Sequence, residues 1–298
     1  MKQKVKKAQI IDWCYGYGMI APLTIGLGVF YLWPVIKVFW DSLHNVGAFN
    51  QRSWAGLDNY IKMFQDEIMW QSLGNTLKYV IVITPVMVIL ALILASLLNT
   101  GIKGRSFFRV IYFIPAITMG AAVAMIWNWM YNGDYGIINA ILEILGFERQ
   151  LFLTNPNIAL YCICIVSIWS SVGYNMIILL AGIQGISKSY YEAAAIDGAN
   201  GIQQFISITL PLVTPTLFFV MITSLMGTFQ MFDAIYMLIP NTGLAIEETQ
   251  SMVVYFYRNA FVFSKKGYAS ALAVFLFLII MAITVVQMKV QDKWVNYE

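Results

Sequence analysis

Residues 73–98 read LGNTLKYVIVITPVMVILALILASLL and contain one charged side chain, that of Lys78. Because an α-helix rises about 1.5 Å per residue, roughly 20 apolar residues are enough to cross the hydrocarbon core of a bilayer. A run of this length predicts a transmembrane helix, from which Lys78 can extend toward the membrane interface. We therefore expect an all-α membrane protein.

Five more apolar runs of similar length are bounded by segments that carry charges, Gly or Pro. They are Tyr15–Ile36, Val110–Met130, Ile158–Ile183, Leu212–Met237 and Ala269–Met288. The first run is longer than the apolar core of a secretory signal peptide and has no clear small-residue cleavage site, so we expect it to be retained. The sequence thus predicts a polytopic fold with an N-terminal segment, residues 1–14, and a single domain of six transmembrane helices, residues 15–298.

The composition agrees with a membrane protein and excludes several functions. Hydrophobic residues make up 60% of the chain and charged residues only 11%, against roughly 25% in an average soluble domain. This leaves too little polar surface to cover a soluble globule, and too few charges for a disordered chain. A formal net charge of +3 provides no phosphate-binding surface, so nucleic acid is not an expected partner.

Cysteine and histidine give no sign of a redox or metal site. Cys14, Cys162 and Cys164 lie in apolar runs, where they behave as small hydrophobic residues. The single histidine, His44, has no second His or Cys at metal-ligand spacing. We therefore predict no metal, no bound cofactor and no catalytic residue in this chain, because a membrane enzyme needs a cluster of such groups at the end of a span.

Lysine and arginine orient the predicted spans, because cytoplasmic loops carry an excess of these residues. With both termini in the cytoplasm, ten of them lie on the inner side: Lys2, Lys4, Lys6, Lys7, Lys103, Arg105, Arg109, Lys188, Lys289 and Lys293. Six lie on the outer side: Arg52, Lys62, Arg149, Arg258, Lys265 and Lys266. This excess favours cytoplasmic N- and C-termini.

The outer segments are then the long ones, and the segment of residues 131–157 has an apolar pattern at helical spacing. Its apolar residues are Ile137, Ile138, Ile141, Leu142 and Leu145. This pattern predicts a short amphipathic helix in the membrane interface. Outer segments of this kind either cap a cavity or receive an external partner, or they are simple connectors.

Residues 185–211 lie between the fourth and fifth spans and read GISKSYYEAAAIDGANGIQQFISITLP. Ser189 with Glu192 three residues later forms a capping box, so we expect a short helix to begin at Tyr190. Gly198 is expected to end it. A folded unit, rather than a simple connector, is therefore predicted here.

The second half of the same loop repeats the pattern. Asn200 with Gln203 forms another capping box, and the apolar residues that follow predict a helix up to Pro211. Two acids, Glu192 and Asp197, lie on this helix–glycine–helix unit. Either Glu192 only caps its own helix and Asp197 only caps the next one, or the unit is a docking element for a soluble protein.

The string Glu192-Ala-Ala-Ala-Ile-Asp-Gly-Ala199, followed by Leu210-Pro211, resembles the EAA motif of permease subunits in binding-protein-dependent ABC importers. The resemblance is to the sugar branch, which includes the maltose, glycerol-3-phosphate and multiple-sugar permeases. Further residues of the pattern occur along most of the chain: Gly56-Leu-Asp-Asn-Tyr60, Asn75-Thr-Leu77, Phe108-Arg109, Pro115, Trp127, Phe232-Asp233-Ala-Ile-Tyr236 and Gly267-Tyr-Ala-Ser-Ala271.

The resemblance implies a coupling role for this loop. In the family it forms a coupling helix in a cleft of a cytoplasmic ATPase subunit. Carried onto this chain, the ATPase-coupling residues are Glu192, Ala193, Ala194, Asp197 and Gly198. ATP and magnesium belong to the partner ATPases, and the chain itself contains no G-x-x-x-x-G-K-S/T sequence.

The resemblance also implies a set of partners and a location. The partners are a second permease subunit in a heterodimer, two ABC ATPase subunits, an extracytoplasmic solute-binding protein and a sugar substrate. The location is the cytoplasmic membrane of a bacterium or archaeon.

Polar groups inside a span are costly unless they face a cavity or a partner, so they are candidates for a substrate pathway. Ser224, Gly227, Thr228 and Met231 share one helical face, with Gln230 and Asp233 close by. The fourth span adds Ser170, Ser171, Tyr174 and Asn175, and the third adds Trp127 and Asn128. The family pattern, in which the two helices beside the EAA loop line the cavity, implies Ser171, Tyr174, Ser224, Gly227, Thr228 and Met231. Helix packing also enriches such small residues and is the alternative explanation.

Asp233 is the only acid inside a predicted span. We expect it to serve as a structural or gate residue of the substrate pathway, and a role in proton coupling is the competing interpretation. An ion-coupled secondary transporter is the main alternative for the whole chain. That class normally has inverted repeats or paired broken helices with ion-binding acids, and the sequence shows no such repeat.

Overall fold

The structure is a computed structural model and describes residues 7–47, 51–240 and 244–296. Within this part of the chain nearly all regular structure is helical. The strands in it are β1 (His44–Val46) and β2 (Arg52–Trp54), which pair antiparallel with His44 opposite Trp54. The chain divides into two compact units, residues 1–63 with 258–275 and residues 64–257 with 276–298. The prediction of a single membrane domain over residues 15–298 stays a prediction.

The first unit contains the N-terminal helices and the β-hairpin. Its helical segments are α1 (Lys7–Leu27), a π-helical turn (Gly28–Leu32), α2 (Trp33–Ser42), α3 (Asp58–Gln65), a second π-helical turn (Arg258–Val262) and the beginning of α16 (Lys266–Gln291). Buried Asn59 ties α3 to the hairpin, because its side-chain amide donates to the carbonyl oxygens of Ser42 (2.9 Å) and His44 (3.0 Å). By contrast, no side chain of residues 11–40 is buried within the structure.

The second unit holds most of the helices. They are α4 (Glu67–Asn99), α5 (Arg105–Ile117), α6 (Gly120–Met130), α7 (Ile137–Ile144), α8 (Pro156–Gln184), α9 (Lys188–Ile196), α10 (Gly201–Gln204), a π-helical turn (Phe205–Thr209), α11 (Leu210–Leu212), α12 (Thr214–Phe229), α13 (Asp233–Leu238), α14 (Leu244–Thr249), α15 (Met252–Tyr257) and the remainder of α16. Side-chain caps fix the starts of the two longest: Asp66 accepts from the backbone N–H of Ile68, and Asn155 from that of Asn157, both at 3.0 Å.

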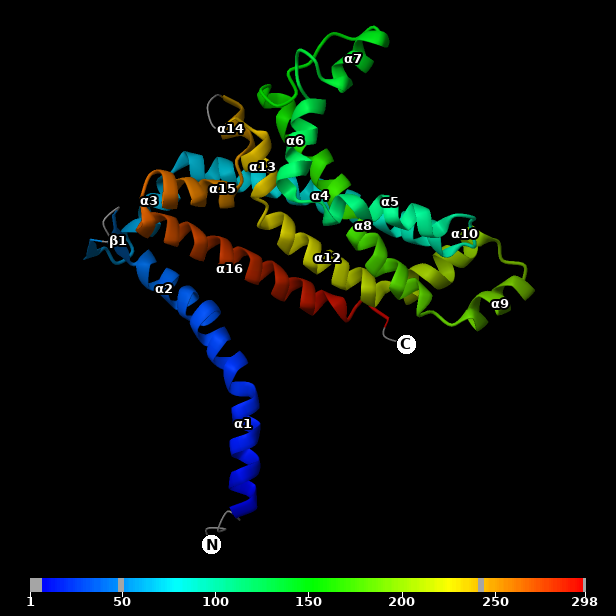
Figure 1. The fold of residues 1–298 in the computed structure, drawn as a ribbon, viewed down its shortest axis with the longest axis horizontal. Helices are drawn as coiled ribbons and strands as arrows, with labels where there is room; N and C mark the ends of the chain where they lie inside the picture. Colours follow the sequence, from blue (N-terminus) through cyan, green and yellow to red (C-terminus); the bar gives the residue numbers. More distant parts are fainter. Residues whose placement is uncertain (1–6, 48–50, 241–243, 297–298) are drawn as a thin grey trace. The chain divides into compact units, whose positions relative to one another are not determined.

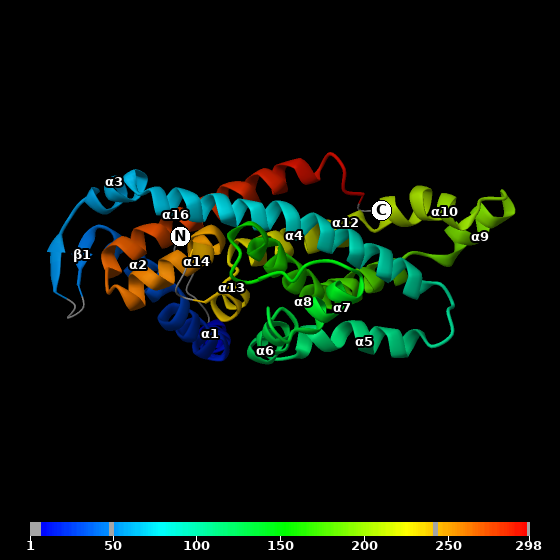
Figure 2. The ribbon, with the colours of Figure 1, turned by 90° about the horizontal axis from the view of Figure 1, so that it is seen from above.

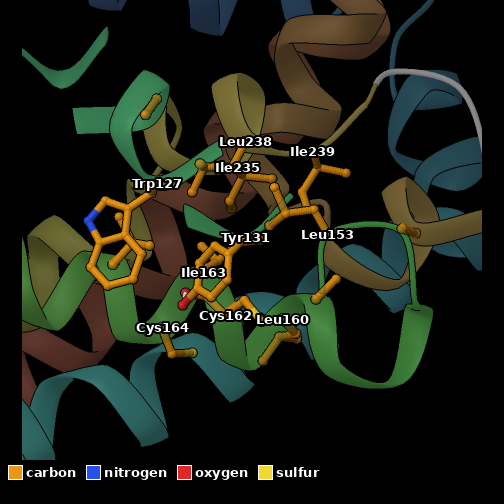
Figure 3. Close-up of a cluster of buried hydrophobic side chains, with 14 of the residues drawn as sticks. Trp127, Tyr131, Leu153, Leu160, Cys162, Ile163, Cys164, Ile235, Leu238 and Ile239 are labelled. Carbon is orange, nitrogen blue, oxygen red and sulfur yellow. Dashed lines mark hydrogen bonds between the residues drawn. The ribbon is translucent and has the colours of Figure 1, made fainter. Parts of the chain in front are cut away.

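Helices α4 and α8 make the most extensive helix–helix contact in this unit, and α5 and α12 pack beside them (Figures 1 and 2). One apolar core lies between α4, α8 and α12 and includes Met87, Met176 and Val220. A second core lies toward α6, α13 and α14, where Trp127, Tyr131, Ile163 and the two α8 cysteines come together with Ile235 (Figure 3). Cys162 and Cys164 therefore pack as small hydrophobic residues, as predicted.

The structure agrees in part with the six predicted spans. Four helical segments are long and apolar enough to cross a membrane: residues 11–42, α4, α8 and α16. Two further candidates are bent pairs, α5 with α6 at 98° and residues 201–212 with α12 at 67°. Within the described residues there are thus four straight candidates, or six if each bent pair forms one span.

The third predicted span, residues 110–130, is wrong as one continuous helix. Thr118 and Met119 leave the helical conformation, with ψ angles of 137° and 131°, and the chain turns there from α5 into α6 (Figure 1). Pro115 and Gly120 flank this break. Proline removes a backbone donor and glycine weakens a helix interior, so together they permit the turn.

The fifth predicted span, residues 212–237, is also not one helix. Helix α12 ends at Phe229, and the chain re-enters a helix only at Asp233. Gln230 and Asp233 are both exposed. A carboxylate in the first turn of a helix is favourable because of the positive end of the helix dipole, and Asp233 takes that place in α13.

Candidate functional site

The predicted docking loop forms two short helices, α9 and α10, at the end of the second unit opposite α13 and α14 (Figures 1 and 2). Its first helix begins earlier than predicted. Ser187 is the N-cap of α9 and accepts from the backbone N–H of Ser189 at 3.4 Å. The expected capping box of Ser189 and Glu192 is therefore wrong, because Ser187 offers the same hydroxyl two residues earlier and Lys188, rather than Tyr190, opens the helix.

The predicted end of the first helix at Gly198 is confirmed. Gly198 follows the end of α9 with φ +82°, a conformation that residues with a Cβ rarely adopt. Its N–H donates to Ala195 O (3.1 Å), and the N–H of Ala199 donates to Ala194 O (2.9 Å). These two bonds form a Schellman motif, which satisfies the last carbonyls of the helix. The reversal after α9 is therefore rigidly defined.

Asn200 forms the capping box that the sequence predicts for the second helix. Its side chain accepts from the N–H groups of Ile202 (3.1 Å) and Gln203 (3.0 Å), and the Gln203 side chain accepts from the N–H of Asn200 (2.8 Å). The expected end at Pro211 is wrong by a residue: helical structure continues through a π-helical turn to Leu212. A widened turn directly before a proline relieves the clash that its ring makes with the preceding helix.

Neither α9 nor α10 buries a side chain. The predicted coupling residues Glu192, Ala193, Asp197 and Gly198 are exposed, and Ala194 is half-buried. Large apolar side chains are exposed beside them: Ile196 at 87% and Ile202 at 72% of their surface. The hydroxyl of Tyr191 lies 3.0 Å from that of Thr209 and ties α9 back to the π-helical turn. The two helices thus present a defined surface that the described part of the chain does not cover.

A second site is a cavity of about 580 Å³ within the second unit. Its walls are the middle of α4, the break between α5 and α6, the middle of α8, the C-terminal half of α12 and the start of α13. The structure brings all seven predicted pathway residues to this cavity: Ser171, Tyr174, Ser224, Gly227, Thr228, Met231 and Asp233. Their contact with a substrate stays a prediction.

The further polar residues named from the sequence divide into two groups. Ser170, Asn175 and Gln230 line the cavity. Trp127 and Asn128 do not: Trp127 belongs to the apolar core in Figure 3, and the side-chain amide of Asn128 donates to Met237 O at 3.2 Å. A polar side chain close to the end of a span is thus not by itself a sign of a cavity.

Asp233 lies elsewhere than predicted. It is the first residue of α13, outside the helix α12 that follows the bend, and its side chain is exposed at the cavity rather than enclosed in a span. The expectation of an acid inside a transmembrane helix is therefore corrected, because the chain leaves the helix at Gln230. Because Asp233 is exposed at the cavity and lies at the positive end of the α13 dipole, its charge needs no neutralising side chain.

The sequence did not identify the part of the cavity wall formed by the break between α5 and α6. Pro115, Thr118 and Gly120 line the cavity there, and Ser167 and Thr223 add hydroxyl groups from α8 and α12. The signal available was the Pro and Gly that bracket Thr118, which marks a break but not which volume the break faces.

The cavity lining is almost uncharged. Asp233 is the one formally charged residue among the described residues that line it. No group of three His, Cys, Asp or Glu side chains within the described ranges could hold a metal ion. The arrangement of hydroxyl, amide and aromatic groups suits hydrogen bonding to a polar solute rather than bond making.

A polar cavity among helices that are long and apolar enough to cross a membrane fits the class of transport permeases. A family model described as the inner membrane component of binding-protein-dependent transport systems matches residues 70–297. The probable ABC transporter permease protein YesP of Bacillus subtilis is 36% identical, over 99% of this chain and 96% of its own length. The trehalose/maltose transport system permease protein MalF of Thermococcus litoralis is 34% identical, over 97% of this chain and 96% of its own.

A solved structure agrees with these relatives. A crystal structure of a bacterial ABC transporter involved in the import of the acidic polysaccharide alginate contains a chain that superposes with a TM-score of 0.87 at 26% identity, over 97% of this chain and 99% of that chain. The present chain belongs to the family of inner membrane components of binding-protein-dependent transport systems. It is an integral membrane permease with relatives in sugar transport, and the resemblance carried by the EAA motif is confirmed.

Proposed function

We propose that this chain is one of the two membrane-spanning subunits of an ATP-driven carbohydrate importer. It contributes part of the translocation pathway and receives the energy of ATP hydrolysis through the α9–α10 loop. Its partners are a second permease subunit, two ABC ATPase subunits that hold ATP and magnesium, and an extracytoplasmic solute-binding protein. The chain itself carries no cofactor.

The proposal includes a topology in the cytoplasmic membrane of a bacterium or archaeon. Each bent pair forms one span, which gives six, and both termini are cytoplasmic according to the distribution of Lys and Arg. On this topology α9 and α10 lie on the cytoplasmic side, where ATPase subunits are found. The α7 segment lies on the outer side.

The observation that carries the proposal is the uncovered surface of α9 and α10. Ile196 and Ile202 are 87% and 72% exposed on two short helices whose backbone is fixed by a Schellman motif and a capping box. Exposed apolar side chains on a rigid element are typical of a docking surface. Glu192 and Asp197 beside them add charge, which favours a basic rim on the partner.

Rigidity is what a coupling element needs. When two ATPase subunits close on ATP, a force on α9 reaches the spans only if the α9–α10 reversal does not yield. The backbone bonds around Gly198 and Asn200 resist such yielding, and the π-helical turn continues through α11 and a 67° bend into α12, which lines the cavity. Movement of α9 is thereby linked to the cavity wall.

The experiment is stimulated ATP hydrolysis by the whole transporter in proteoliposomes, with its own binding protein and substrate. Gly198→Val places a β-branched residue at φ +82°, so we expect substrate-stimulated hydrolysis to fall to the basal level while membrane insertion is unchanged. Gly201→Ala is the matched control, because a Cβ at Gly201 has open space and an ordinary φ.

Glu192→Lys tests the same surface without changing the backbone, and it is also expected to lose stimulation. Stimulation at the wild-type level in both Gly198→Val and Glu192→Lys would refute docking through this loop. Uptake that follows an ion gradient in the absence of ATP would refute the importer itself and favour a secondary transporter.

A further inference from the structure

The cavity between α8, α12 and the α5–α6 break has a distinct electrostatic character. None of its described lining residues is Lys, Arg or His, and Asp233 supplies a negative charge. The side chain of Asp233 is exposed at the cavity, and no ion pair to it occurs in the described part of the chain. A carboxylate or phosphate in this volume would meet repulsion from Asp233 without a compensating cation among the described lining residues of this chain.

The hydrogen bonds of the cavity wall also disfavour an anionic solute. A hydroxyl group has one hydrogen to donate and two lone pairs that accept. Four hydroxyls in the wall donate that hydrogen to a carbonyl oxygen one helical turn earlier in the chain: Thr118 to Ile114 (2.8 Å), Ser170 to Val166 (2.7 Å), Thr223 to Phe219 (2.8 Å) and Thr228 to Ser224 (2.8 Å). With these bonds in place, the four groups face the cavity as acceptors.

Two more hydroxyls are used in the same way. Ser224 donates to Asn175 Oδ1 at 3.4 Å, and Ser167 donates to the Met231 sulfur at 3.2 Å. Donors to a solute remain on Ser171, Tyr174 and Gln230, whose side chains have no hydrogen-bond partner among the described residues, and on Asn175, whose amide uses one of its two hydrogens for Ser171 O. Six hydroxyls of the wall thus face the cavity as acceptors, and these four side chains supply the donors.

A solute that fits such a wall must bring its own donors. Each hydroxyl of a neutral sugar both donates and accepts, so it can pair with the acceptors and with the remaining donors of the wall. An ionised carboxylate or phosphate only accepts, so it can pair only with those donors, and it faces Asp233. The exposed aromatic ring of Tyr174 in the wall suits the apolar side of a sugar ring.

Family membership leaves this choice open, because one similar protein is named for trehalose and maltose and another for an acidic polysaccharide. We propose that the cargo of this transporter is a neutral oligosaccharide and that the cavity discriminates against sugars with carboxylate or phosphate groups. The inference rests on the proposed function. It adds the chemical class of the substrate and a selectivity role for Asp233.

The test uses the whole transporter in proteoliposomes with its own binding protein. Mass spectrometry of the sugar that co-purifies with the binding protein is the first measurement, and we expect no ionised group on it. The second is the ATP-driven uptake of maltotriose and of trigalacturonate as neutral and acidic probes of equal length, each loaded to saturation of the binding protein so that capture does not limit the comparison.

We expect the acidic probe to enter at less than about one tenth of the rate of the neutral probe. In Asp233→Asn the ratio of acidic to neutral uptake should rise severalfold, because one repulsive charge is removed with little change in shape. Glu148→Gln, at an exposed position away from the cavity, is the matched control and should leave the ratio unchanged.

Three outcomes separate the possibilities. A carboxylated or phosphorylated sugar on the binding protein, or equal uptake of the two probes, would overturn the inference while leaving the importer intact. An unchanged ratio of acidic to neutral uptake in Asp233→Asn would show that Asp233 does not contribute to the selectivity. ATP-independent uptake, or no ATP-driven uptake of the co-purified cargo, would instead contradict the proposed function.

Discussion

A single methyl group at Gly173 should disrupt the packing of α5 on α8. A Cβ built at Gly173 lies 1.7 Å from Tyr112 O, 2.5 Å from Tyr112 C and 3.1 Å from Phe113 Cα. All three are backbone atoms of α5, so no side-chain rotation can relieve the overlap. Ordinary contact begins at 3.4 Å, and α5 would have to move by about 1.7 Å to allow it.

The magnitude follows from the cost of overpacking, which is typically about 1–3 kcal/mol. Gly173→Ala belongs at the upper end of that range, because the obstacle is a whole helix backbone rather than a side chain. At about 2–4 °C per kcal/mol for 150–250 residues, a loss of about 3 kcal/mol lowers the apparent Tm by roughly 6–12 °C. The α5 residues Pro115 and Ala116 line the cavity, so uptake should fall as well.

The assay is thermal unfolding of the purified protein in detergent, together with uptake by the reconstituted transporter. Gly120→Ala is the matched control, because Gly120 lies on the same cavity wall and a Cβ there has no atom within 4 Å. Its apparent Tm should stay within about 2 °C of wild type. An equal Tm in Gly173→Ala and Gly120→Ala would refute the close approach of α5 to α8.

Two further predictions concern the segment around α7. The buried side chain of Asn139 donates to the carbonyls of Asn132 (3.2 Å), Gly133 (3.2 Å) and Gln150 (3.0 Å) and accepts from the N–H of Gln150 (2.9 Å). Asn139→Ala should therefore lower the local stability by about 2–4 kcal/mol and raise hydrogen exchange over residues 132–150. Asn128→Ala removes a single hydrogen bond and should not raise exchange in this segment. A donated hydrogen bond from Arg149 lowers the pKa of Glu143, so their ion pair stabilises this segment above the ordinary pKa of the carboxyl group and is lost as the pH falls through the lowered value. A carboxyl NMR titration should give a Glu143 pKa below its usual range, and Arg149→Ala should restore it; a titration that Arg149→Ala does not change would contradict the pairing.

The candidate sites were predictable from the sequence where the signal is local. Gly198 and the capping box at Asn200 depend only on neighbouring backbone groups, and both are present in the structure. The start of α9 was missed because Ser187 and Ser189 carry the same hydroxyl two residues apart. The cavity face of α12 was predictable because a helix of regular period places Ser224, Gly227 and Thr228 on one side.

Other parts of the cavity were not predictable in this way. Pro115 and Gly120 mark a weak point in an apolar run, but the 98° turn between α5 and α6 depends on the helices that receive each half. Asp233 appeared to lie inside a span because hydropathy continues past Phe229, although the helix does not. Hydropathy reports where lipid can be tolerated, and it does not report where the backbone stays helical.

The sequence by itself determined that this protein belongs in a membrane, that four of its stretches form long apolar helices and where the α9–α10 loop turns. Those properties follow from transfer free energies and from hydrogen bonds between residues a few positions apart. Only the tertiary structure decided that α5 and α6 part at Thr118, that Gly173 meets the backbone of α5, and that most hydroxyls around the cavity are left as acceptors. These three features depend on how segments far apart in the sequence pack against each other, which hydrogen bonds between neighbouring residues do not specify.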